Sequence, residues 1–190
     1  KATIWATSQI FSPLVKMNNN LEVTPLVARK WEISTNGREY VFTLRRDVFF
    51  HDHSIFRNGR GRSVVASDFV YSFNRLLSED LVSSGSWVFN HVENYYAEND
   101  SVLVINLQNQ FPAFLSLLSM QYCSVVPHEL ADRDEFRSHP IGTGPFKFQY
   151  WKEGVKLVLR KNENYFEKEN GERLPKLDAV AITFIKDKQS

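Results

Sequence analysis

The stretch that most constrains the fold is residues 28–50. Polar and apolar residues alternate around Trp31, which is the period of a half-buried strand. Asn36-Gly37 follows, and this pair tolerates the positive φ that a tight hairpin turn requires. Alternation resumes over 39–44, where one face is formed by Tyr40, Phe42 and Leu44. The stretch therefore predicts an antiparallel hairpin with a scaffold role, because it carries no set of catalytic side chains.

The rest of the chain predicts short elements of both kinds. Apolar residues at helical spacing predict a helix over 66–77, with Ser67 or Asp68 capping its start. Further hairpins are expected at 92–107 and 146–160, and short helices at 111–120 and from Pro127 onward. Single strands are expected at 1–6, 122–126 and 177–185, and a loop or edge strand at 8–15. Without a strand–helix–strand repeat, this pattern indicates an α+β fold with largely antiparallel pairing.

Composition excludes several classes of protein. The chain has 190 residues, of which 43% are hydrophobic, so it can bury a substantial core. Its 23 basic and 22 acidic residues lack the basic excess of a nucleic-acid-binding protein, so we expect no nucleic-acid partner. The lone Cys123 is expected to be a buried, unreactive side chain. No apolar run approaches the ~20 residues of a membrane-spanning helix, and no signal peptide is visible. We therefore expect the numbering to begin inside a longer protein.

Two motifs could carry chemistry. His51 and His53 would share one face of a strand and could offer two imidazoles to a metal ion, as in a metal-dependent hydrolase. No third ligand has diagnostic spacing, so a polar turn is the favoured interpretation. Gly142-Thr143-Gly144 lacks the other residues of a nucleotide-binding loop and precedes a strand. We expect it to let the backbone approach another strand or a ligand closely. Neither motif predicts a catalytic residue, a cofactor or a metal site.

Four ordered blocks carry a family resemblance. They cover residues 10–14, 28–51, 64–75 and 141–165, and include Glu39-Tyr-Val-Phe-Thr-Leu-Arg45 and Ile141-Gly-Thr-Gly-Pro-Phe-Lys-Phe148. In this order they resemble the bacterial family 5 extracellular solute-binding proteins, which are the oligopeptide-, dipeptide- and nickel-binding components of ABC importers. Positions 11 and 12 depart from the family's early segment, because Phe11 and Ser12 stand where the family has Tyr and Glu.

The resemblance implies a fold and a site. The fold is α+β, periplasmic-binding-protein-like class II, and the chain would be the N-terminal portion of lobe I, with a family-specific β-rich subdomain at about 66–130 and the second lobe absent. Peptide ligands of this family are held partly as an added β-strand. The implied ligand-binding residues, near the cleft between the lobes, are Gln9, Ile10, Phe11, Ser12, Trp87, Gly142 and Thr143.

The implied function is solute capture without catalysis. The full-length protein would deliver a peptide or other small solute to the membrane permease and ATPase subunits of an ABC importer. It would act at the periplasmic or extracellular face of the membrane and be lipid-anchored. Nickel-chelate, haem or oligosaccharide binding are alternatives within the family. A metal-dependent hydrolase using His51 and His53, and a signalling or chaperone role for a peptide binder without a transporter, also stay open.

Overall fold

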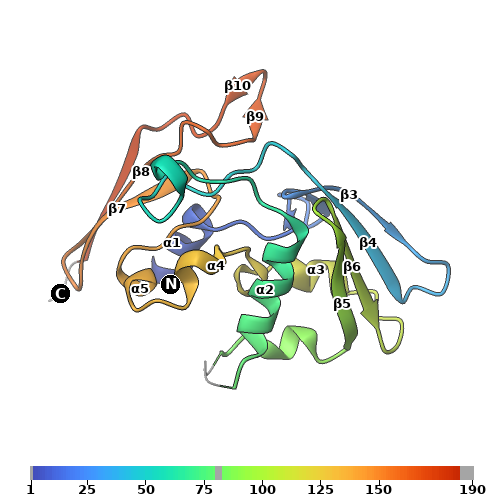
Figure 1. The fold of residues 1–190 in the computed structure, drawn as a ribbon. Coiled ribbons are helices and arrows are strands. Elements are labelled where there is room, and N and C mark those ends of the chain that lie inside the picture. The colour runs from blue at the N-terminus through green and yellow to red at the C-terminus, as the bar shows by residue number, and fades with distance from the viewer. Residues whose placement is uncertain (1, 80–82, 185–190) are drawn as a thin grey trace, which may run out of the picture.

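The computed structural model describes residues 2–79 and 83–184 of the chain (Figure 1). Within them, the chain forms short helices and antiparallel strands, as the sequence predicts. The helices are α1 (Ala2–Ile10), η1 (Arg57–Gly59), α2 (Ala66–Leu77), η2 (Ser86–Phe89), α3 (Phe114–Leu118), η3 (Gln121–Cys123), α4 (His128–Ala131) and α5 (Glu135–Ser138), where η marks a 3-10 helix. The strands are β1 (Val15–Met17), β2 (Val23–Pro25), β3 (Ala28–Ile33), β4 (Glu39–Leu44), β5 (Val92–Asn99), β6 (Val102–Leu107), β7 (Phe146–Lys152), β8 (Lys156–Lys161), β9 (Lys168–Glu169), β10 (Glu172–Arg173) and β11 (Ala179–Thr183).

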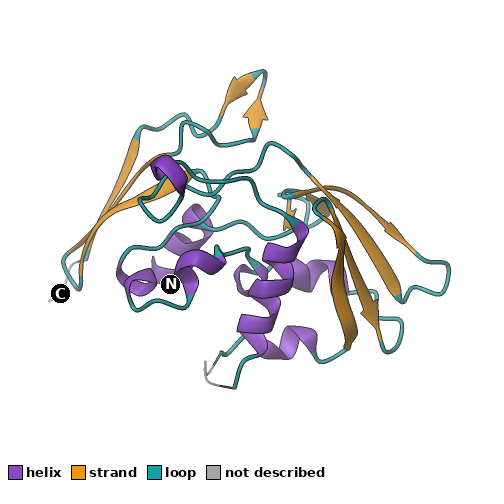
Figure 2. Cartoon of the chain, viewed as in Figure 1, coloured by secondary structure: helices purple, strands orange, loops and turns teal. Residues whose placement is uncertain are grey.

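Two sheets frame the molecule, and helices lie between them (Figure 2). A four-stranded sheet has the order β3-β4-β6-β5, and a three-stranded sheet has the order β11-β8-β7. There are also two small ribbons, β1-β2 and β9-β10, and an isolated antiparallel bridge between Phe49 and Ser63. Every pair is antiparallel, which confirms the α+β prediction.

The predicted hairpin at 28–50 is present as β3 and β4. Trp31 pairs with Phe42 across it. Gly37 has a φ of 67°, so the Asn-Gly turn uses the left-handed conformation expected of it. The predicted inward face of β4 is buried, with Phe42 fully so. The hairpin therefore forms one edge of the larger sheet, as a scaffold element.

Helix α2 has the predicted bounds, but its cap precedes the expected Ser67 or Asp68. The N-cap residue is Val65. The Asp68 carboxylate accepts a hydrogen bond of 2.9 Å from the Val65 backbone N–H, which supports the first turn from inside the helix. The helix buries Phe69 and Phe73 in the main core, where Phe73 packs against Phe89.

Two local predictions are wrong. The strand expected at residues 1–6 is absent, because the described part of this segment belongs to α1, which continues to Ile10 and takes up part of the loop expected at 8–15. The strand expected at 122–126 is also absent: η3 covers the first two residues, and the backbone is then extended without a strand partner. The small helix expected from Pro127 onward is present as α4, and a separate short helix, α5, follows it.

The other expected elements are present. Strands β5 and β6 form the second hairpin, β7 and β8 form the third, and β11 pairs with β8. Cys123 is buried and free, as expected, and burial raises the pKa of its thiol to about 12. None of the described helices combines the length and the apolar character needed to cross a bilayer.

Candidate functional site

Two segments that are far apart in the sequence meet at the end of α1. The backbone N–H of Gly144 donates a 2.8 Å hydrogen bond to the carbonyl oxygen of Ile10. A Cβ atom at Gly142 would lie 2.0 Å from that oxygen, and one at Gly144 would lie 2.4 Å from the carbonyl oxygen of Gln9. Side chains are sterically excluded at both positions, so the glycines allow this contact. The predicted close approach is confirmed, and the neighbour is the end of a helix.

A buried histidine holds this turn from the other side. The side chain of His51 is 4% exposed. Its Nε2 lies 3.0 Å from the carbonyl oxygen of Gly144, and its Nδ1 accepts a 3.3 Å hydrogen bond from the N–H of Gly142. Asn162 Nδ2 donates a second hydrogen bond, also of 3.0 Å, to the Gly144 oxygen. The ring is therefore the neutral tautomer that carries its proton on Nε2.

His51 is not arranged as a metal ligand. Both ring nitrogens are occupied by backbone groups, and burial lowers the pKa of His51 to about 4. His53 Nδ1 instead accepts a hydrogen bond from the N–H of Ile55. Residues 2–79 and 83–184 contain no group of three or more His, Cys, Asp or Glu side chains that could hold a metal ion. This donor arrangement fits the polar turn that the sequence favours over a metal-dependent hydrolase.

The other predicted ligand residues are divided between two places. The carbonyl oxygen of Ser12 accepts a 3.1 Å hydrogen bond from Val125, and Phe11 packs edge-on against Phe136 at 5.9 Å between ring centroids. Thr143 is buried within the glycine turn. Trp87 lies apart from this group on η2 and is 45% exposed. The structure thus brings together six of the seven predicted residues, all but Trp87.

A cavity of about 620 Å³ opens beside Phe11. This volume is within the range of about 300–1,000 Å³ that is usual for small-molecule sites. Its wall combines residues from the end of α1, from α2, from η3 and from α5, including Phe11, Ser72, Arg75, Gln121, Ser124 and Phe136. Apart from Phe11, none of these six is singled out by a sequence motif, because the cavity exists only once the four helices have packed.

The loop that carries Trp87 is fixed near this cavity. A Cβ atom at Gly85 would lie 2.3 Å from Cγ of Tyr122, so the Tyr122 ring rests directly on the Gly85 backbone. Tyr122 and Ser83 both line the cavity, whereas Trp87 is not among the lining residues. Trp87 is therefore carried on a segment that borders the cavity without forming its wall.

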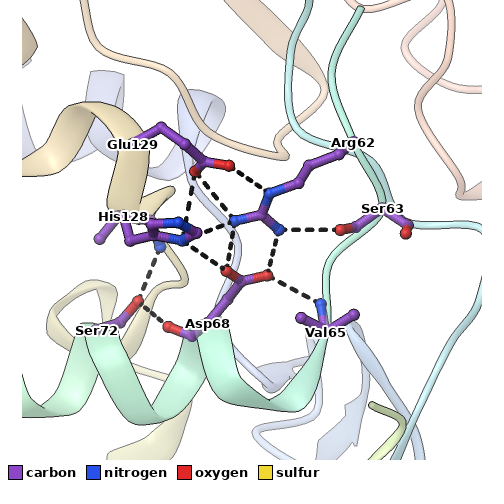
Figure 3. A network of polar contacts seen from close by, with 8 residues as sticks. Arg62, Ser63, Val65, Asp68, Ser72, His128 and Glu129 are labelled. Atoms are coloured by element: carbon purple, nitrogen blue, oxygen red, sulfur yellow. Dashed lines mark hydrogen bonds and ion pairs between the residues drawn. The ribbon is translucent and has the colours of Figure 1, made fainter. Parts of the chain in front are cut away.

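A partly buried ionic network connects α2 to α4 (Figure 3). Arg62 donates two hydrogen bonds to Asp68, of 2.7 and 2.8 Å, and two to Glu129, of 2.6 and 3.0 Å. Partial burial acts to raise the pKa of Glu129, but the hydrogen bonds and charge of Arg62 and a backbone hydrogen bond together outweigh it, and the pKa is lowered. The exposed His128 ring lies at the rim, 3.8 Å from Asp68 and 3.5 Å from Glu129.

The same network leads directly to the cavity wall. Ser72 Oγ donates a 2.6 Å hydrogen bond to the carbonyl oxygen of Asp68 and accepts one of 3.0 Å from the N–H of Val126. Ser72 and Val126 both line the cavity. The ionic network and the Ser72 hydrogen bonds therefore fix the position of α2 relative to Val126, and both contribute to the cavity wall.

Two named binding proteins are similar in sequence to this chain over most of its length. It is 29% identical to the heme-binding protein A of Haemophilus influenzae over 96% of the chain and 36% of that protein. It is 27% identical to the dipeptide-binding protein of Escherichia coli over 87% of the chain and 33% of that protein. The chain thus spans about a third of the length of these relatives.

A solved structure shares the fold. The ABC transporter-associated periplasmic binding protein DppA of Helicobacter pylori, in complex with the peptide STSA, superimposes with a TM-score of 0.82 at 28% identity. The alignment covers 95% of this chain and 38% of that one. This likeness confirms a periplasmic-binding-protein fold of which the chain is a part. Residues 22–190 also match the model of the bacterial extracellular solute-binding proteins, family 5. The chain belongs to this family of solute-binding proteins.

Proposed function

We propose that the protein is the substrate-binding component of an ABC importer and captures peptides. The observation that carries the proposal is the junction of residues 9–12 with the 142–144 turn, next to a cavity of about 620 Å³. Here two backbone segments meet, and Phe11 from one of them lines the cavity, which suits a ligand recognised largely through its own backbone. The proposed ligand contacts are Gln9, Ile10, Phe11, Ser12, Gly142 and Thr143, with Trp87 at the border.

Peptide is the favoured solute for two reasons. The Escherichia coli relative is named a dipeptide-binding protein, and the Helicobacter pylori structure contains a bound peptide. In addition, residues 9–12 and 142–144 include no charged side chain, so the junction does not call for a charged solute. We propose binding without covalent chemistry, in which a second lobe closes over the solute and is stabilised because the solute contacts both lobes.

The proposed partners and location follow from the importer role. The loaded protein would dock on a membrane permease whose transport is driven by ATPase subunits. It would work outside the cytoplasmic membrane, on its periplasmic or extracellular face, and be held there by a lipid anchor. The membership of the chain in family 5 supports these assignments.

Calorimetry on the full-length protein tests the peptide assignment. Defined di- and tripeptides and a mixed peptide pool are titrated into ligand-free protein. We expect one peptide bound per protein, with micromolar affinity or tighter, and no peptide hydrolysis by mass spectrometry. Absence of binding by every peptide, or release of cleaved peptide, would contradict the proposal.

Haem is the strongest competing solute, because the Haemophilus influenzae relative is named a heme-binding protein. Native mass spectrometry of full-length protein as purified separates the two solutes by mass. A ladder of peptide masses is expected. A single mass increment equal to haem, with its visible absorption band, would replace the peptide assignment with a haem assignment.

A further inference from the structure

We propose that the cavity beside Phe11 receives an uncharged, mainly apolar side chain of the captured solute, and that Gln121 and Ser124 hydrogen-bond to a polar group on it. This inference rests on the proposed peptide-binding function and adds a specificity to it. The cavity would act as a side-chain pocket, whereas the glycine junction would contact the solute backbone.

Position connects the cavity to the proposed backbone contacts. Phe11 belongs to the segment that meets the glycine turn, and its ring also forms part of the cavity wall. A solute lying along residues 9–12 would therefore have this opening directly beside it. The ring of Phe136 packs against Phe11 and lines the same cavity. Together the two aromatic rings give the opening an apolar side.

Charge excludes an ionised side chain. Arg75 is the charged residue among the described residues of the wall, and it is already engaged. Its Nε lies 3.3 Å from Asp132, its Nη2 donates a 2.9 Å hydrogen bond to the carbonyl oxygen of Ala131, and its guanidinium lies over the Phe136 ring. An acidic side chain would have to compete with Asp132, and a basic one would meet no carboxylate among the described lining residues. Burial of either charge would therefore be unfavourable.

Two polar atoms in the wall lack partners. Gln121 Oε1 and Ser124 Oγ are buried, and neither has a hydrogen-bond partner among the described residues. Ser124 is only 7% exposed, so its hydroxyl is shielded from bulk water. Unpaired buried oxygens are unfavourable, and both side chains can rotate to meet a new donor. A tyrosine hydroxyl would donate to Gln121 Oε1 and accept from the Ser124 hydroxyl, whereas a tryptophan N–H would donate to one of the two oxygens.

The test uses full-length protein and tripeptides based on tri-alanine, with Phe, Tyr, Lys or Glu placed at each position in turn. Affinities are measured by calorimetry at pH 8. At one peptide position we expect Phe and Tyr to bind at least about tenfold more tightly than Lys and Glu. Gln121→Glu places a carboxylate in the wall, and it should improve Lys relative to Phe at that position by about tenfold or more.

Matched controls make the outcome specific. Gln108→Glu adds the same charge at an exposed residue directly after β6 and should leave the preference unchanged. Tyr should bind more tightly than Phe at this position because of its hydroxyl, and Ser124→Ala, chosen because it removes only one oxygen, should reduce this advantage. Melting temperatures of all variants verify that they are folded.

Two outcomes would overturn the proposed side-chain pocket but not peptide capture. One is equal affinity for peptides with all four side chains, and the other is a preference that Gln121→Glu and Ser124→Ala both leave unchanged. Failure of every peptide to bind wild-type protein would overturn both.

Discussion

His51 Nε2 lies 3.0 Å from the carbonyl oxygen of Gly144, a residue 93 positions later in the chain. This contact joins the loop after the first hairpin to the turn that packs against the end of α1. The buried histidine therefore has a structural role, because it orients the backbone of the proposed ligand-contacting turn. It acts on the candidate site through Gly142 and Gly144, without a predicted contact to the solute.

Replacing His51 with alanine should destabilise the fold strongly. The N–H of Gly142 would lose its acceptor and the buried ring would leave a void, so we expect a loss of about 3 kcal/mol in the free energy of unfolding. Urea-induced unfolding followed by circular dichroism measures the loss. His91→Ala, at an exposed histidine, is the matched control and should change stability little. Equal effects of the two substitutions would contradict the role of His51.

The contribution of His51 should depend on pH. Because burial lowers its folded-state pKa from 6.5 to about 4, the unfolded chain binds more protons than the folded chain between these values. The stabilisation is therefore fully present above pH 6.5 and is lost as the pH falls toward 4. The stability difference between wild type and His51→Ala should shrink by about 2 kcal/mol from pH 7.5 to pH 5. A difference that stays constant or grows on acidification would refute the buried neutral ring.

Gly142→Ala should separate the two segments of the candidate site. The new Cβ would lie 2.0 Å from the carbonyl oxygen of Ile10, so the turn or the helix end must move. We expect a loss of about 2 kcal/mol in unfolding free energy and weaker solute binding. Gly59→Ala is the comparison, because that Cβ meets no atom within 4 Å and only the positive φ of 70° opposes it. Binding by Gly142→Ala equal to that of Gly59→Ala would argue against the junction as a ligand site.

Arg62→Ala should show the importance of the ionic network. It would leave the carboxylate of Asp68, which is 2% exposed, without its cation, and we expect a loss of about 3 kcal/mol in unfolding free energy. Lys30→Ala removes one member of the exposed pair with Glu32 and should have no measurable effect. Because α2 and α4 support the cavity, solute affinity should fall with Arg62→Ala as well. A stability loss no greater than that of Lys30→Ala would contradict the network's structural role.

Elements with a strong local pattern could be predicted from the sequence. The hairpin around Asn36-Gly37 combines a turn pair with alternation on both sides, and α2 combines helical spacing with an acidic first turn. The segment at 1–6 alternates loosely, which predicts a strand, yet it is helical where described. The apolar residues Cys123 and Val125 are buried in the main core, although they do not belong to a strand. The conformations of residues 1–6 and 122–126 therefore could not be predicted from the local sequence pattern.

The candidate site was predictable only in part. Gly142 and Gly144 indicated a close backbone approach to an unspecified neighbour, and the family resemblance placed residues 9–12 and this turn near the same cleft. Gln121 and Ser124 carry no motif, since they become neighbours of Phe11 only through the packing of four helices. The sequence around Arg62 likewise indicates a solvated Gly- and Arg-rich loop, whereas the fold places its guanidinium between two carboxylates.

Hydrogen exchange of full-length protein, with and without a saturating tripeptide, tests the central claim most directly. Mass spectrometry follows the backbone amides of residues 9–12 and 142–144, with the hairpin turn at 34–37, in which Thr35 and Asn36 are exposed, as an internal reference. We expect the tripeptide to slow exchange in both site segments by about tenfold or more and to leave the turn unchanged. Saturating tripeptide that leaves exchange in both site segments unaltered would contradict peptide capture at this junction.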